Sequence, residues 1–138
     1  MAIQKAKERL AERSGRINWI EGDITEVALK PAYYDLWHDR AVFHFLNQAE
    51  DREAYVRAAE LALKPGGYLI LAGFSMIGPK HCSGLDVVRY NQDTLQAELG
   101  SQFVLLRSVE EPHLTPTGVR QEFLYCLFRK RGTEDPRP

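Results

Sequence analysis

The sequence lacks the features that mark secreted, membrane-bound and metal-binding proteins. It has two cysteines in 138 residues, too few and too differently placed for a disulfide framework or a zinc site. Its longest apolar run, around residues 68–73, falls far short of the roughly 20 residues that span a bilayer. The N-terminus is charged and has no hydrophobic signal core. We therefore expect a cytoplasmic protein with free thiols, no bound metal and no membrane partner.

The sequence also lacks an excess of either charge. Its 18 Lys and Arg residues are balanced by 19 Asp and Glu residues, for a net charge of −1. Clustered Lys and Arg side chains bind nucleic acids by displacing the counterions on the phosphates. This sequence has no such cluster, so it gives no basis for a nucleic-acid partner. What is present, 44% hydrophobic and 27% charged residues, is typical of one soluble globular domain. We expect its partners to be small molecules or proteins.

Hydrophobic periodicity predicts alternating helices and strands. An opening helix ends at Ser14-Gly15, and alternating residues 16–21 predict a short strand that runs into a loop at Gly22-Asp23. The later elements expected are a strand at 34–37, a helix capped by Asn47 and ended by residues 64–67, a strand at 68–74, a helix between Asn91 and Gly100, and strands at 103–106 and 122–128. This order predicts an α/β fold with mostly parallel strands and a C-terminal antiparallel hairpin.

Two polar segments rich in turn residues interrupt this pattern. Residues 75–90 have no clean period, and compact domains keep such long connections mainly for binding. Residues 111–120 predict a second loop. The charged, proline-containing segment 131–138 predicts a disordered tail, so that the domain spans residues 1–130.

Several motifs together resemble one enzyme family. They are Gly22-Asp23-Ile24, the run from Tyr34 to Leu46 that contains Trp37-His38-Asp39-Arg40, the turn Leu63-Lys64-Pro65-Gly66-Gly67, Cys82-Ser83-Gly84-Leu85 and Val88-Arg89-Tyr90. Over roughly residues 1–130 the chain is similar to class I S-adenosylmethionine-dependent methyltransferases that act on small molecules. The resemblance implies a three-layer, Rossmann-like α/β fold and S-adenosylmethionine as cofactor.

One part of the family pattern is missing from the sequence. Family members begin with a strand, a glycine-rich turn, a helix and a second strand whose acidic end holds the cofactor ribose. Gly66-Gly67 does not replace that turn, because it follows a helix instead of beginning one. The resemblance therefore implies a truncated core with impaired cofactor binding. Because the missing strands would leave an apolar sheet edge exposed, we expect a homo-oligomer, most simply a two-fold dimer.

The resemblance assigns roles to nine residues. The assignments are cofactor binding for Asp23, Ile24 and Trp37, catalysis for His38, Asp39 and Arg40, and substrate binding for Arg89, Tyr90 and His113. Each group also has a structural alternative. Asp23 can bond its own loop amides, residues 38–40 can form a paired network, and Arg89 can pair with Asp86 or Asp93.

Two functions remain open from the sequence. The first is a small-molecule methyltransferase, incomplete as given or completed by a partner chain. The alternative is a non-catalytic oligomeric module, derived from a methyltransferase, that binds a small ligand or another protein. Residues 37–40 and 89–90 favour the first function, and the missing glycine-rich turn favours the second.

Overall fold

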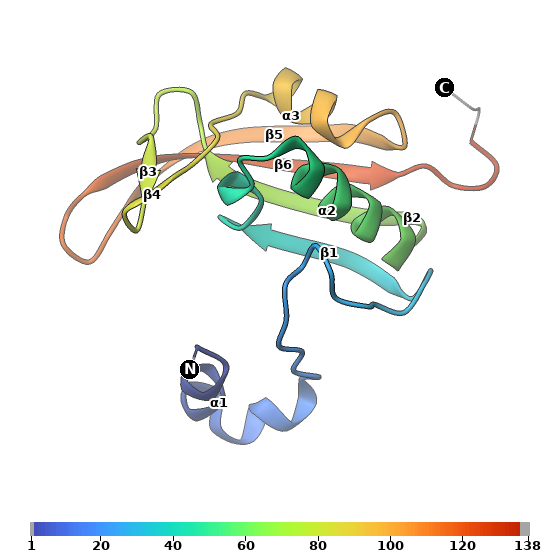
Figure 1. Ribbon diagram of the computed structural model, residues 1–138, viewed down its shortest axis with the longest axis horizontal. Coiled ribbons are helices and arrows are strands. Elements are labelled where there is room, and N and C mark those ends of the chain that lie inside the picture. The colour runs from blue at the N-terminus through green and yellow to red at the C-terminus, as the bar shows by residue number, and fades with distance from the viewer. Residues whose placement is uncertain (1, 136–138) are drawn as a thin grey trace.

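The computed structural model describes residues 2–135, whose centre is a four-stranded mixed sheet (Figure 1). The spatial order of its strands is β1 (Tyr34–Arg40), β2 (Leu63–Phe74), β6 (Arg120–Lys130) and β5 (Phe103–Leu114). β1 pairs with β2 in parallel, and β6 is antiparallel to both of its neighbours. Three of the four strands therefore run in one direction, and β5 and β6 form a hairpin. Both features confirm the predicted fold class.

The helices α2 (Ala49–Ala62) and α3 (Gln92–Leu99) cover the same face of the sheet (Figure 1). One hydrophobic core joins them to the strands, and its buried members include Tyr55, Ala59, Leu69, Leu71, Leu95, Leu99, Cys126 and Phe128. On the opposite face, the small hairpin of β3 (His81–Cys82) and β4 (Leu85–Asp86) packs near Phe74 and Phe123. Within residues 2–135 this hairpin alone represents the third layer.

The register of β1 decides which side of the sheet each of its residues faces. Trp37 and Asp39 lie opposite Leu69 and Leu71, which belong to the core under the helices. Successive side chains of a strand point to opposite faces, so His38 and Arg40 lie on the other side. The sequence motif at 37–40 is therefore divided between two faces.

The strand predicted at residues 16–21 is wrong. The chain begins with α1 (Ala2–Leu10) and the 3-10 helix η1 (Ala11–Arg16), and residues 17–21 then follow an irregular path. A strand needs a neighbour to satisfy its backbone groups, and no described strand lies beside this segment. Figure 1 shows α1 apart from the sheet, and it buries no residue.

The start of α2 differs from the prediction by one residue. Gln48, not Asn47, precedes the first helical residue, and no side chain caps the helix. The Asn47 amide instead reaches the backbone carbonyl of Asp86 at 3.5 Å. The helix expected between Asn91 and Gly100 is present as α3. Asn91 and Thr94 form a reciprocal capping box at its start, and Gly100 follows it at a φ of +81°.

The turn at residues 64–67 lies inside β2 instead of between helix and strand. α2 ends at Ala62, and β2 begins at Leu63, with a register irregularity against β1. A Cβ atom at Gly67 would lie 2.9 Å from the carbonyl oxygen of Lys64 and 3.2 Å from that of Asp35. Glycine is therefore required where the two strands come together.

Half of the loop predicted at residues 111–120 is strand. β5 continues to Leu114 and β6 begins at Arg120, which leaves residues 115–119 as the turn. Its Thr115 N–H and carbonyl both bond within the turn, to Val119 and Gly118. The correction moves His113 from a loop to a strand.

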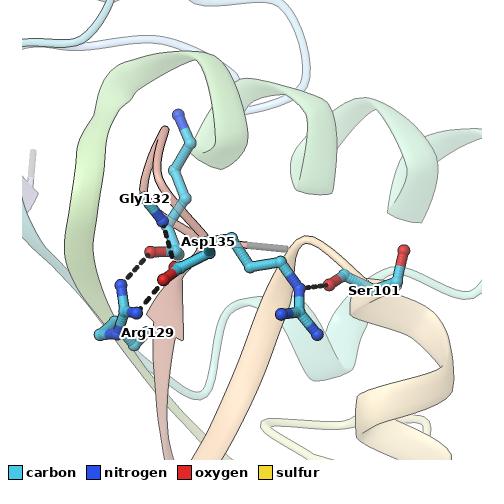
Figure 2. Close-up of polar contacts among 6 residues, drawn as sticks. Ser101, Arg129, Gly132 and Asp135 are labelled. Carbon is cyan, nitrogen blue, oxygen red and sulfur yellow. Dashed lines mark hydrogen bonds and ion pairs between the residues drawn. The ribbon is translucent and has the colours of Figure 1, made fainter. Parts of the chain in front are cut away.

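Residues 131–135 are held against the ends of the strands. The backbone N–H of Arg131 donates to the Gln102 carbonyl at 2.9 Å, and its Nε donates to the Ser101 carbonyl at 2.7 Å. Figure 2 shows Arg129 and Gly132 both donating to the Asp135 carboxylate. The last part of the predicted tail, residues 136–138, lies outside the described residues.

The helices of the chain are short. The longest in the described part, α2, has 14 residues. A bilayer requires about 20 apolar helical residues. None of the helices within residues 2–135 is long and apolar enough to cross a membrane.

Candidate functional site

A groove of about 420 Å³ lies beside β1 and is the place where most of the predicted site residues meet. Its wall contains Ile24, Trp37, His38, Asp39 and Arg40, five of the nine predicted residues. Mainly apolar side chains complete the lining, namely Ile20, Leu29, Tyr34, Leu36, Val42 and Tyr55. In open α/β sheets, ligands bind near the carboxyl ends of the strands, where Asp39 and Arg40 lie.

Asp39 forms a buried network of hydrogen bonds on the helix side of β1. Its Oδ1 accepts from the Val42 N–H at 2.9 Å, and its Oδ2 accepts from the Phe43 N–H at 3.0 Å and from the Tyr55 hydroxyl. Burial raises the pKa of Asp39, and these three hydrogen bonds oppose that shift. Asp39 thus caps the turn after β1, which is the paired arrangement that the sequence allows.

Tyr55 is a member of the site to which the sequence assigned no role. Its hydroxyl accepts from the Trp37 indole N–H at 2.9 Å and donates to Asp39. Burial and the neighbouring carboxylate both raise the pKa of this phenol. A tyrosine on the buried stripe of a helix was the available signal, since a buried hydroxyl needs a polar partner.

Asp23 organises the exposed turn beside the groove. Its Oδ1 accepts from the backbone N–H of Thr25 at 2.8 Å and from the Thr25 hydroxyl at 2.7 Å, and these bonds lower the pKa of Asp23. The loop alternative that the sequence left open for Asp23 is therefore present. Its Oδ2 accepts no hydrogen bond from the described residues, and Ile24 packs against the core beside it.

Arg40 lies on the face opposite to Asp39 and contacts the C-terminal hairpin. Its guanidinium carbon lies 4.5 Å from the ring centroid of Phe123, and its Nε donates to the Tyr125 hydroxyl at 3.1 Å. Sequence analysis missed both aromatic partners, which lie more than 80 positions away on β6. Their alternation on one strand was the signal, but nothing local joins them to Arg40.

Arg89 and Tyr90 lie away from the groove. The Arg89 Nη1 donates to the backbone carbonyls of Met76 at 2.8 Å and Gly78 at 3.1 Å, so this side chain fastens the loop 75–90. It forms no ion pair with Asp86 or Asp93 in the described part of the chain, so the structural alternative that the sequence left open for Arg89 is not present there. Tyr90 is buried among core residues, and burial raises its pKa to about 12.

His113 approaches the same aromatic residue as Arg40. Its ring meets Phe123 edge-on at a centroid distance of 5.8 Å. Cys82, from the β3–β4 hairpin, packs against the same small cluster as Phe123. The structure therefore brings His113 and Arg40 to one aromatic patch, which the sequence spacing does not indicate.

His44 is a buried polar residue with no predicted ligand role. It is 1% exposed, and neither ring nitrogen has a hydrogen-bond partner among the described residues. Burial lowers the pKa of His44 to about 4, so the ring is neutral at physiological pH. Its Cβ and ring pack closely against Gly73, where an added Cβ atom would lie 3.2 Å from the Cβ of His44.

The remaining reactive side chains do not gather into a site. Within residues 2–135, no group of three or more His, Cys, Asp or Glu side chains is placed to hold a metal ion. Burial raises the pKa of the Cys126 thiol to about 11, which keeps it protonated and inert.

Comparison with solved structures identifies the fold. The chain matches the *Burkholderia thailandensis* 1,6-didemethyltoxoflavin-N1-methyltransferase, solved with 1,6-didemethyltoxoflavin and S-adenosylhomocysteine, at a TM-score of 0.70 and 18% identity, covering 93% of this chain and 56% of that one. It matches the N-methyltransferase NodS of *Bradyrhizobium japonicum*, solved with S-adenosylhomocysteine, at a TM-score of 0.66 and 18% identity, covering 91% and 62%. A protein of echinomycin biosynthesis matches at 0.70 and 16% identity, covering 96% and 64%.

The chain thus spans less than two thirds of the length of these three proteins. No curated protein matches it in sequence. The family model of the methyltransferase domain matches residues 1–71, which is half of the chain and includes α1, β1, α2 and most of β2. This match shows that the chain belongs to the methyltransferase-domain family, and the solved structures show that it shares the fold of methyltransferases solved with S-adenosylhomocysteine.

Proposed function

We propose that this chain builds the acceptor side of an S-adenosylmethionine-dependent methyltransferase for a small molecule. The observation that carries the proposal is the groove at the carboxyl end of β1, where an exposed cation, Arg40, stands beside an apolar wall. Such a groove suits a small organic ligand with a polar group, because the apolar walls bind the body of the ligand and a few polar groups fix its orientation. The cofactor, when bound, supplies an electrophilic methyl group on its sulfonium.

Residues in the groove and Asp23, in the turn beside it, fit the adenine end of that cofactor. Asp23 has one carboxylate oxygen available to accept from an exocyclic amine, since Thr25 engages only the other among the described residues. Ile24 and Val42 both line the groove and offer aliphatic surface to a flat ring. These contacts support adenine binding, and they involve side chains that the fold leaves accessible.

We expect residues 1–138 alone to bind S-adenosylmethionine only weakly in this groove. β1 pairs with β2 and has no described neighbour on its other edge. Contacts at the adenine end must then offset an association cost of roughly 4–15 kcal/mol by themselves. We propose a dissociation constant in the millimolar range or weaker, with polypeptide beyond this edge needed for tight binding.

A titration followed by nuclear magnetic resonance tests this proposal. S-adenosylmethionine should shift the backbone amides of Ile24 and Val42 saturably, with a millimolar dissociation constant. Asp23→Ala should abolish the shifts, and Glu21→Ala, a nearby exposed carboxylate, should retain them. Micromolar binding that Asp23→Ala abolishes would show a complete site and contradict the weak-binding part of the proposal. No shift in any variant would instead favour the non-catalytic module.

One observation favours that second function. Asp39, the buried carboxylate of the groove, already accepts three hydrogen bonds, from Tyr55 and two backbone amides, and this structural role disfavours its use as a general base. A non-catalytic module would keep such a network for stability alone. Methyl transfer to a good nucleophile also proceeds by orientation and desolvation without a base, so this observation does not displace the first function.

We further propose that a second copy of the chain covers the outer edge of β1. Exposed apolar side chains gather there, namely Ile20, Tyr33, Leu36 and Val42. An unpaired strand edge with apolar surface favours pairing with another strand, and closed two-fold symmetry is the commonest arrangement. The expected dimer pairs β1 with β1 of its partner and competes with a ligand for the groove, because Ile20, Leu36 and Val42 belong to both surfaces.

Light scattering after size exclusion tests this dimer. The wild type at micromolar concentration should have twice its chain mass of 15.8 kDa. Leu36→Lys should give a monomer, because it places a charge in the middle of the pairing edge. Leu106→Lys is the matched control, since Leu106 is equally exposed (50% against 51%) but lies on β5, at the other end of the sheet. A monomeric wild type, or a dimer that Leu36→Lys leaves intact, would contradict the proposal.

A further inference from the structure

The guanidinium of Arg40 is fixed in place yet has no anionic partner in the described chain. Its plane packs over the ring of Phe123 at 4.5 Å, and its Nε donates to the Tyr125 hydroxyl at 3.1 Å. The ion pairs among residues 2–135 involve other cations, on Arg52, Lys64, His81, Arg120 and Arg129. Glu111 pairs in register with Phe123 and forms no ion pair with Arg40. Arg40 is thus an exposed cation in a defined position.

The surface under Arg40 is rigid. Phe123 is 2% exposed and meets Phe74 edge-on at a centroid distance of 5.1 Å. Tyr125 lies 5.9 Å from Phe123 on the same strand face, and His113 closes the remaining side of the ring at 5.8 Å. The contact with Phe123 and the hydrogen bond to Tyr125 thus hold the Arg40 guanidinium over this cluster of rings without a ligand.

Most of the hydrogen-bonding capacity of Arg40 remains available. A guanidinium carries five N–H donors, and only the Nε donor has a partner among the described residues. The four donors on the two Nη atoms form the planar fork that matches a carboxylate. Arg89, to which the sequence assigns substrate binding, differs in this respect because its Nη1 is committed to two backbone carbonyls.

Arg40 also belongs to the wall of the groove. It lines the groove together with Asp39 and Val42, at the carboxyl end of β1. Tyr125 and Phe123 hold its other side, away from the groove. A ligand bound to the Nη fork therefore lies at the border between the groove and the aromatic hairpin, next to the place proposed for the cofactor.

We propose that Arg40 binds a carboxylate of the methyl acceptor through its two Nη groups, with Phe123 and Tyr125 as positioning residues and His113 at the rim. The inference rests on the proposed function, because it names the substrate class of the same site: a small, carboxylate-bearing molecule. A carboxylate is favoured over a phosphate because one planar cation matches its single charge and its geometry. Prior packing on Phe123 reduces the side-chain entropy lost on binding.

Benzoate, with benzamide as its neutral isostere, is a direct probe. We expect benzoate to shift the Nε–Hε resonance of Arg40 saturably and benzamide to leave it unchanged. Arg40→Lys should weaken benzoate binding, measured at the His113 ring resonances, at least about tenfold, because lysine lacks the planar fork. Tyr125→Phe should weaken it by about threefold, since it removes the hydrogen bond that orients the guanidinium. Arg107→Lys, on an exposed position of β5, is the matched control and should bind as the wild type does.

The outcomes separate this inference from the proposed function. Benzoate binding is measured without cofactor, so it can fail while S-adenosylmethionine still shifts Ile24, and the reverse can also occur. Equal affinity for benzoate and benzamide, or unchanged affinity in Arg40→Lys with wild-type thermal stability, overturns the inference. Tighter binding of inorganic phosphate than of benzoate overturns the assignment to a carboxylate.

Discussion

Replacing Asp39 by alanine should lower the free energy of unfolding by about 3–5 kcal/mol, because it leaves a set of buried polar groups without their charged partner. The Val42 and Phe43 amides and the Tyr55 hydroxyl all donate to this carboxylate. In the buried turn after β1 they have no replacement acceptor in the described chain. This loss of unfolding free energy is a large fraction of the roughly 5–15 kcal/mol that stabilises a typical domain.

Urea denaturation measures this effect, with two further variants for comparison. Asp39→Asn should cost less than Asp39→Ala, because the amide oxygen still accepts one of the hydrogen bonds. Asp35→Ala, on the same strand, should cost less than about 1 kcal/mol, since its ion pair with Lys64 is exposed. If Asp39→Ala lost no more than Asp35→Ala, the network would not stabilise the turn.

Acidification should lower the free energy of unfolding through His44, by about 3 kcal/mol between pH 6.5 and pH 4. In the folded chain, burial lowers the pKa of this ring from 6.5 to about 4. The unfolded chain therefore binds a proton first as the pH falls. The stabilisation is fully present above pH 6.5 and is lost progressively down to the folded pKa.

His44→Phe separates this contribution from those of the other titrating groups. The variant should lose that part of the acid dependence, measured as the difference in unfolding free energy between pH 7 and pH 4.5. At pH 7 it should be at least as stable as the wild type, because both ring nitrogens of His44 lack a partner in the described residues. His38→Gln, at an exposed position, should keep the wild-type dependence. An unchanged pH dependence in His44→Phe would contradict the prediction.

Asp39 and Arg40 show why a sequence motif is a poor guide to which side chain is available to a ligand. Asp39 and Arg40 are neighbours in the sequence and were expected to act together. The two-residue period of β1 sends Asp39 into the core under α2 and Arg40 to the aromatic hairpin. One stabilises the fold, and the other is available to a ligand.

The elements that local rules predict best are those that carry their own signals. The capping box of α3 lies within four residues, and the apolar run of β2 between glycines is typical of a central strand. The segment 16–21 has an equally good strand pattern but forms no strand. To form a strand, this segment needs a partner strand from a distant part of the sequence, and its local pattern does not indicate whether that partner is present.

By itself, the sequence determined the class of the fold, the family and the position of the groove residues along the chain. The alternation of capped helices with apolar runs specifies strands and crossovers, and the motif at 37–40 follows a strand into its carboxyl end. These are properties of short segments, where propensity and periodicity act directly.

Only the tertiary structure decided the partners of these residues. Tyr55 joins Asp39 across 16 positions because α2 covers the face of the sheet to which Asp39 points, and Tyr125 joins Arg40 across 85 because only β2 separates β6 from β1 in the sheet. It also decided that Arg89 binds backbone carbonyls and that His113 lies on a strand beside Phe123. The contacts between side chains of different strands depend on the register of the sheet. A shift of one residue in a strand would turn each of its side chains to the opposite face.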